Sequence, residues 1–208
     1  MLTVYFVRHG QSRGNVDRVH QGSKSPLSPL GKKQAKRIAT RLLKHNIDHI
    51  YASPYKRAKE TAIEISKSLK RPIHYWGEIK EMPNPSELVD LHYKHPRAEK
   101  IRNVIRKHEH MANWKYSDEE SFNETKKRAI KVLTHLEKSH KTQNIVCVSH
   151  GSIIKLMMCL IIFGEGIGPE VFRDYQNNVK TNNTGVTKCI YNKRFGWSMI
   201  TWNDSSHL

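Results

Sequence analysis

The stretch Val4-Tyr5-Phe6-Val7-Arg8-His9-Gly10 has a counterpart in Ile145-Val146-Cys147-Val148-Ser149-His150-Gly151. Each is a short apolar run, rich in β-branched residues and closed by glycine, which is typical of a buried parallel strand. Ligands of open α/β sheets bind outside the carboxyl ends of such strands. If the two strands are neighbours, His9 and His150 meet there with Arg8 beside them. Two imidazoles and a guanidinium at one sheet edge suit a phosphoryl group.

The rest of the chain alternates between helical and strand patterns. Helical spacing of apolar residues predicts helices over residues 30–45, 54–69, 122–138 and 152–163. Short apolar runs predict strands over residues 47–52 and 72–76, and a closing hairpin of 186–191 with 197–202. Ser121 and Glu124 have the spacing of a capping box. We therefore expect a three-layer α/β/α sandwich with a mostly parallel, mixed central sheet.

The length of 208 residues fits one domain, which we expect to span residues 1–208. Residues 82–121, called the cap segment below, have the least regular pattern. We expect them to form a small helical cap over the strand ends. This segment includes residues 92–116, which hold seven lysines or arginines and four histidines against two glutamates. Such a cap would attract a substrate with additional negative groups, although a solvated helix face explains the same composition.

Bulk composition excludes several classes of protein. The chain has no run of eighteen apolar residues and no visible signal peptide, so we expect a cytoplasmic protein with no membrane partner. Its cysteines, Cys147, Cys159 and Cys189, show neither a disulfide framework nor metal-ligand spacing. The formal net charge is +17, from 36 lysines and arginines against 19 acidic residues, which favours anionic partners.

Three segments in this order resemble the histidine phosphatase superfamily, which includes the cofactor-dependent phosphoglycerate mutases. The first is Arg8-His9-Gly10-Gln11-Ser12, the second runs from Ala52 to Ala62 and contains Arg57, and the third is Val148-Ser149-His150-Gly151. The tail from Trp202 to Leu208 is similar to the ending of many phosphatase members. The resemblance covers residues 3–208, essentially the whole chain.

The resemblance implies a role for each matching residue. His9 would be the nucleophile that becomes a phosphohistidine, because a neutral imidazole offers a nitrogen lone pair at pH 7. Arg8 and Arg57 would bind the phosphoryl oxygens, and His150 would add a hydrogen-bond donor in the transition state. The helix that begins near Gly151 would direct its amides toward the same anion. The loop residues matching those that reach the substrate are Asn15, Gln21 and Gly22.

The leaving alkoxide needs a proton, which family members supply from a carboxylic acid. Alignment of Ile79-Lys80-Glu81 with the family pattern makes Glu81 the acid, with Glu78 as the alternative and Glu87 as a more distant one. The continuation Met82-Pro83-Asn84-Pro85 departs from the usual family sequence. None of this chemistry needs a metal or another cofactor.

The sequence therefore predicts a phosphomonoester hydrolase that acts through a phosphohistidine on a small phosphorylated metabolite. One alternative is a phosphotransferase of the phosphoglycerate mutase type, which shares the first half-reaction. A second alternative is a non-catalytic protein that binds RNA or another polyanion. The basic charge permits it, but no aromatic nucleic-acid motif is present, so nucleic acid is not an expected partner. A homodimer is left open.

Overall fold

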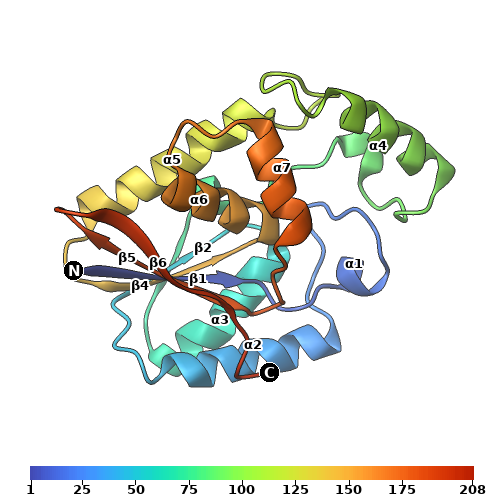
Figure 1. The fold of residues 1–208 in the computed structure, drawn as a ribbon. Coiled ribbons are helices and arrows are strands. Elements are labelled where there is room, and N and C mark those ends of the chain that lie inside the picture. The colour runs from blue at the N-terminus through green and yellow to red at the C-terminus, as the bar shows by residue number, and fades with distance from the viewer.

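The computed structural model describes residues 1–208, and its centre is a six-stranded sheet covered by helices on both faces (Figure 1). The strand order is β3-β2-β4-β1-β5-β6. The first four of these run parallel, whereas β5 is antiparallel to both β1 and β6. The strand bounds are β1 (Leu2–Arg8), β2 (His49–Ala52), β3 (Ile73–Tyr75), β4 (Asn144–Ser149), β5 (Val186–Asn192) and β6 (Gly196–Asp204). The expected mixed, mostly parallel sheet is confirmed.

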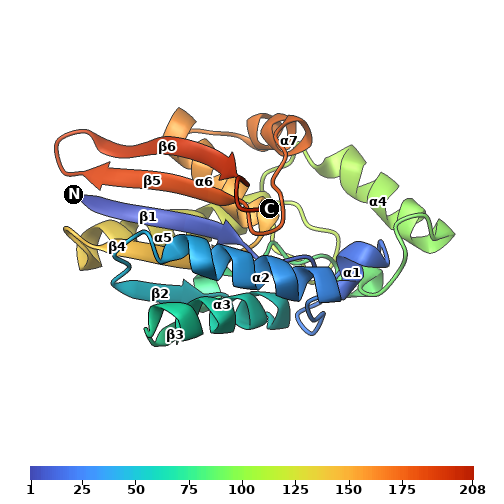
Figure 2. The same cartoon turned by 90° about the horizontal axis from the view of Figure 1, so that it is seen from below.

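Helices form the outer two layers. Their bounds are α1 (Arg13–Val16), α2 (Pro29–Leu42), α3 (Lys56–Leu69), α4 (Pro96–His108), α5 (Phe122–Ser139), α6 (Gly151–Phe163) and α7 (Pro169–Asn178). Figure 2 shows α2 and α3 side by side on one face of the sheet, with α5 and α6 behind it. The expected three-layer sandwich is therefore confirmed. None of the helices combines the length and the apolar character needed to cross a membrane.

Alternation along the central strands divides the core between the two layers. In β1, Val4 and Phe6 pack into the cluster that includes α5 and α6, whereas Tyr5 and Val7 pack into the cluster that includes α2 and α3. Successive side chains of a strand point to opposite faces, so a continuous apolar run fills both cores. This double burial fixes the strand in register and holds its carboxyl end, where His9 follows, in one position.

The cap segment was expected to be helical, although no helix bounds were predicted for it, and it contains the 13-residue helix α4. Helix α7 was not predicted. Both helices have proline at their first position, a recognised start signal. A smaller difference is that α3 begins at Lys56 rather than at Pro54. The capping box of Ser121 and Glu124 at the start of α5 is confirmed.

The cap segment lies apart from the three layers, at the carboxyl ends of the parallel strands (Figure 1). Leu88, Ala98 and Ile101 give it a small buried cluster of its own. A short antiparallel bridge between Val19 and His92 joins it to the loop that follows α1, and Glu120 near its end forms ion pairs with Lys80 and Arg128. Backbone pairing and ion pairs together therefore hold the cap segment over the strand ends.

Candidate active site

The two histidines singled out in the sequence lie together at one edge of the sheet. Their strands β1 and β4 pair in parallel, with Arg8 opposite Ser149 at the last paired position. The imidazole centroids of His9 and His150 are 5.1 Å apart. The parallel register thus brings both residues to the same level of the sheet, as expected for strands that are neighbours.

The contacts of His9 identify its tautomer. Its Nδ1 lies 2.7 Å from the carbonyl oxygen of Gly10, which only accepts hydrogen bonds, so Nδ1 carries the proton. The lone pair is then on Nε2, which accepts a 3.1 Å hydrogen bond from Nε of Arg57. Burial, together with the charges of Arg57 and Arg8, holds the pKa of His9 well below its usual range. The ring is therefore neutral, and the lone pair of Nε2 is directed at the guanidinium of Arg57.

Arg8 and Arg57 bring two positive charges to this buried edge. Arg57 is 2% exposed and donates from Nη1 to the carbonyl oxygen of Gly22 at 2.8 Å. Arg8 donates from Nη1 to the carbonyl oxygen of Thr181, while its Nε has no partner. Burial lowers the pKa of both groups, and the charge of Glu81 opposes this shift. Neither arginine has an ion pair, so the site carries positive charge that a bound anion would neutralise.

His150 lies behind His9 rather than in the pocket. It is fully buried, and its Nε2 is 2.7 Å from the hydroxyl oxygen of Ser53. Its Nδ1 is buried without a hydrogen-bond partner. Burial and the charge of Arg57 hold the pKa of His150 well below its usual range. The structure thus places His150 against His9 with one nitrogen still free to bond.

The carboxylate of Glu81 lies at the N-terminus of α6. Its carboxylate accepts hydrogen bonds from the backbone N–H groups of Met82 at 3.0 Å, Ile153 at 3.1 Å and Ser152 at 3.3 Å. We expected the amides that follow Gly151 to face a phosphoryl group, and that expectation is wrong for the amides of Ser152 and Ile153. A helix N-terminus attracts the nearest anion, which here is the side chain of Glu81.

The two alternative carboxylates lie elsewhere. Glu78 forms an ion pair with Lys131 at 2.6 Å, and this contact with Lys131 lowers its pKa. Glu87 accepts a 2.9 Å hydrogen bond from the hydroxyl of Ser117 on the cap segment. Neither residue lines the pocket that contains His9.

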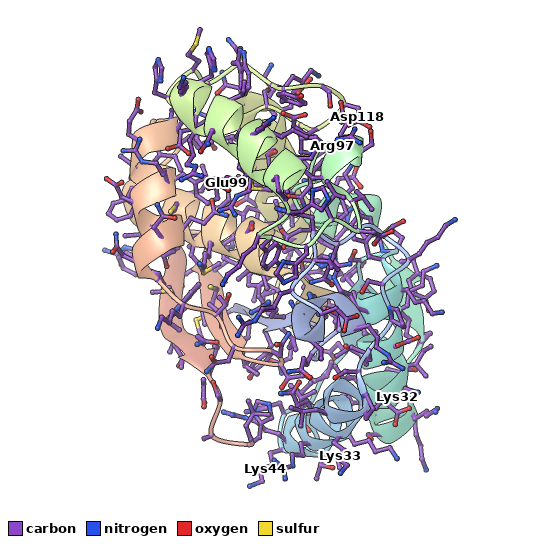
Figure 3. The ribbon with its side chains drawn as sticks, turned by 90° about the vertical axis from the view of Figure 1, so that its right-hand side faces the viewer. Lys32, Lys33, Lys44, Arg97, Glu99 and Asp118 are labelled. Carbon is purple, nitrogen blue, oxygen red and sulfur yellow. The ribbon has the colours of Figure 1, made fainter.

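Six of the nine predicted site residues line one pocket of about 350 Å³. It is lined by Arg8, His9, Asn15, His20, Gln21, Arg57, Glu81, Met82, Asn84, Tyr93, Arg102 and Ser152. Gly22 lines an adjoining pocket of about 480 Å³, which shares Gln21 and Glu81 with the first. Gly151 does not line either pocket. Figure 3 views this side of the molecule, with the cap segment, marked by Arg97, Glu99 and Asp118, above the strand ends.

Sequence reasoning missed several residues of the site. Asn183 donates from Nδ2 to the carbonyl oxygen of His9 at 3.0 Å, and Thr181 holds Arg8. Tyr93 and Arg102 reach the pocket from the cap segment. The basic composition of residues 92–116 was a signal for Arg102. No sequence pattern marked the loop before β5, which contains Thr181 and Asn183.

The pocket holds no group of three or more histidine, cysteine or acidic side chains that are placed to bind a metal ion. Its positive charge comes from guanidinium groups, and its unpartnered nitrogens are Nε of Arg8 and Nε2 of His20. The arrangement brings a neutral imidazole, two guanidinium groups and a carboxyl group to one cavity. Such a set is suited to displacement at phosphorus.

Known proteins resemble the chain over nearly its full length. The family model described as histidine phosphatase superfamily (branch 1) matches residues 4–205. The protein named "Putative phosphoserine phosphatase 2" of Hydrogenobacter thermophilus is 32% identical over 197 residues, covering 90% of this chain and 89% of its own. A metal-independent phosphoserine phosphatase of Arabidopsis thaliana is 28% identical over 219 residues, covering 99% of this chain and 82% of its own. A crystal structure of a phosphoserine phosphatase mutant of Entamoeba histolytica with phosphoserine has a TM-score of 0.81 at 25% identity, and 100% of both chains is covered.

Proposed function

The chain belongs to the histidine phosphatase superfamily, and from this membership we propose that it hydrolyses small phosphomonoesters through a phosphohistidine at His9. One observation carries the proposal. The buried Arg57 and the half-buried Arg8 have no ion pair, and they lie beside a neutral His9 that lines the pocket. Burying an unpaired charge costs several kcal/mol, roughly. A phosphoryl dianion would neutralise both groups, and its phosphorus would then lie near the nucleophile.

In the first step, Nε2 of His9 attacks phosphorus while the bond from phosphorus to the leaving oxygen breaks. The hydrogen bond from Arg57 to Nε2 is released as the guanidinium turns to the phosphoryl oxygens. Glu81 gives its proton to the leaving alkoxide. In the second step, Glu81 takes a proton from water, the hydroxide attacks the phosphohistidine, and inorganic phosphate leaves with His9 neutral again.

The cap segment supports a substrate with a second anionic group. Arg102 and Tyr93 reach the phosphate pocket from this segment, and His20 lies against Tyr93 with ring centroids 4.8 Å apart. A guanidinium binds a carboxylate with two parallel hydrogen bonds. Two relatives described above are phosphoserine phosphatases, whose named substrate joins a phosphate to a carboxylate. We therefore propose a small phosphorylated carboxylic acid, such as phosphoserine, as the substrate.

The test is to trap the intermediate with ³²P-labelled phosphoserine and an alkaline detergent quench at short times. We expect a base-stable, acid-labile adduct in the native protein and none in His9→Ala. An acid-stable adduct, or equal labelling of the variant, would contradict the phosphohistidine. Transfer of the labelled phosphoryl group to water identifies a phosphatase. Transfer to another organic acceptor identifies the mutase alternative.

A further inference from the structure

A further pocket lies between α2 and the C-terminal tail. Its volume is about 550 Å³, and it shares no residue with the pocket around His9. The lining contains neither a carboxylate nor an apolar side chain. It consists of Arg37, Thr40, Arg41, Lys44, His45, Ser206 and His207.

The cations of this pocket come from α2 and the turn that follows it. Arg37 and Arg41 are four residues apart, which places them on the same side of the helix, and Lys44 follows in the turn after Leu42. Like charges at this spacing destabilise a helix, and no acidic residue occurs from residue 18 to residue 47 to offset them. Helix stability therefore does not explain the arrangement, whereas binding of an anion does.

Only one of the three cations is neutralised. Arg41 forms an ion pair with Asp204, and it also donates from Nη1 to the hydroxyl of Ser206 at 2.9 Å and to Nδ1 of His207 at 3.1 Å. These contacts hold the tail against α2 and form one wall of the pocket. Arg37 and Lys44 are exposed and have no ion pair, so their charges remain available to a ligand.

We propose that this pocket binds a small anion that carries a diphosphate group. Arg37 and Lys44 lie on either side of Arg41 along the chain, and both line the pocket without an ion pair. An anion with two phosphoryl groups can therefore place one group against each of these cations. Guanidinium and ammonium groups are the usual donors to phosphate oxygens, and Thr40 and Ser206 add hydroxyl donors.

The pocket is also connected to the phosphate site by hydrogen bonds. Because Arg41 only donates, Nδ1 of His207 accepts, and Nε2 of His207 carries the proton. Nε2 then donates to the hydroxyl of Thr184 at 3.0 Å, and the amide of Thr184 donates to the carbonyl oxygen of Arg8 at 2.9 Å. The ligand would therefore bind behind the strand that positions Arg8, outside the catalytic pocket.

The test is isothermal titration with methylenediphosphonate, whose P–C–P linkage resists hydrolysis. The catalytic pocket is first saturated with orthovanadate, so that only binding outside it is measured. We expect one site in the native protein and at least about tenfold weaker binding in Arg37→Gln/Lys44→Gln, because two charge-assisted contacts are lost. Both side chains are exposed, and the melting temperature verifies that the variant is folded.

The matched control is Lys32→Gln/Lys33→Gln, which removes the same charge from the same helix outside the pocket. Figure 3 shows Lys32 and Lys33 on α2, with Lys44 just beyond its end. We expect this control to bind like the native protein. Equal weakening in both variants, or no binding to the native protein, would overturn the proposal. A nucleoside 5′-diphosphate titrated in the same way distinguishes a nucleotide from inorganic diphosphate as the source of the group.

Discussion

Glu81 differs from Glu78 and Glu87 in what its carboxylate touches. It lines the pocket with His9 and rests on the first amides of α6. Glu78 instead pairs with Lys131 on the surface of α5. The position of Glu81 is therefore set by the helix that begins directly after His150, and this favours it as the group that protonates the leaving oxygen.

A comparison of leaving groups tests the role of Glu81. A general acid matters most when the leaving group is a poor one, so Glu81→Gln should slow hydrolysis of an alkyl phosphate by about 10²-fold or more. An aryl phosphate with a good leaving group should be affected much less. Steady-state kcat with both substrates is the measurement, and Glu78→Gln is the matched control. A loss that depends on the leaving group in Glu78→Gln, and not in Glu81→Gln, would reverse the assignment.

Among single residues, the sequence predicted the placement of those that directly follow a strand. His9 and His150 each close an apolar run, so their meeting follows from the pairing of two buried strands. Thr181 and Asn183 belong to a loop without periodicity. Their contacts with Arg8 and His9 exist only because β5 pairs with β1. Such contacts depend on tertiary structure, and no local pattern encodes them.

The first turn of α2 lies directly against Gly10 and Gln11, the loop that follows His9. A Cβ atom built on Gly31 would be 1.9 Å from the carbonyl oxygen of Gln11, and one on Gly10 would be 2.6 Å from the carbonyl oxygen of Gly31. Both contacts involve backbone, which side-chain rotation does not relieve. The two segments approach closely only because both residues lack a side chain.

Gly31→Ala should therefore be destabilising and should also lower activity, because the loop that follows His9 must move. Overpacking of this kind costs about 1–3 kcal/mol or more. Gly77→Ala is the matched control, since a Cβ there meets nothing within 4 Å. Urea denaturation and kcat for both variants give the comparison. A Gly31→Ala protein as stable and as active as Gly77→Ala would show that the loop tolerates the shift.

Helix α4 brings Arg102 to the pocket from one face and exposes Arg106 one turn further along, where its Nη2 bonds to Asn103. We expect Arg102→Ala to raise the KM for phosphoserine by about tenfold or more, since a charged hydrogen bond contributes about 1.5–3 kcal/mol. The same variant should hydrolyse an aryl phosphate monoester that has no second charged group with nearly native kcat/KM. Arg106→Ala should change neither value. Equal effects of the two variants would remove Arg102 from substrate recognition.

The bounds of α4 within the predicted helical cap were not predicted, and α7 was not predicted at all. Only Ala98 and Ile101 of α4, and only Phe172 of α7, are buried. An apolar stripe this narrow gives a weak helical signal, although the proline at each first position was informative. By contrast, α5 buries Ala129, Val132, Leu133 and Leu136 against the sheet, and that wide stripe made it predictable.

Across the whole molecule, burial leaves many of the 13 histidines hard to protonate. Burial is the first cause of a lowered pKa at His9, His20, His45, His49, His150 and His207. The unfolded chain protonates these rings near their ordinary pKa of about 6.5. Below that pH the unfolded state binds more protons than the folded state, and stability decreases as pH falls.

We expect the free energy of unfolding to be nearly constant above about pH 7 and to decrease between about pH 6.5 and 5. Each fully buried ring contributes a slope of up to about 1.4 kcal/mol per pH unit. Urea denaturation at constant ionic strength is the measurement. Paired carboxylates such as Glu120 lose their stabilising contribution only at lower pH, near their ordinary pKa of about 4.3. A stability that rose on acidification through this window would contradict the assignment.

The backbone bridge between the cap segment and the loop after α1 constrains how the protein can be recombined. The amide of His20 bonds to Leu91 at 3.0 Å, its carbonyl bonds to Asp90 at 2.8 Å, and Arg57 is anchored on Gly22 two residues later. A chimaera that exchanged the cap segment alone would therefore disturb the anchor of Arg57, the arginine that we propose to bind phosphate. An exchange that preserves this bridge takes residues 17–22 together with residues 82–121, two pieces far apart in the sequence. New substrate preferences would then arise by matched changes in both pieces.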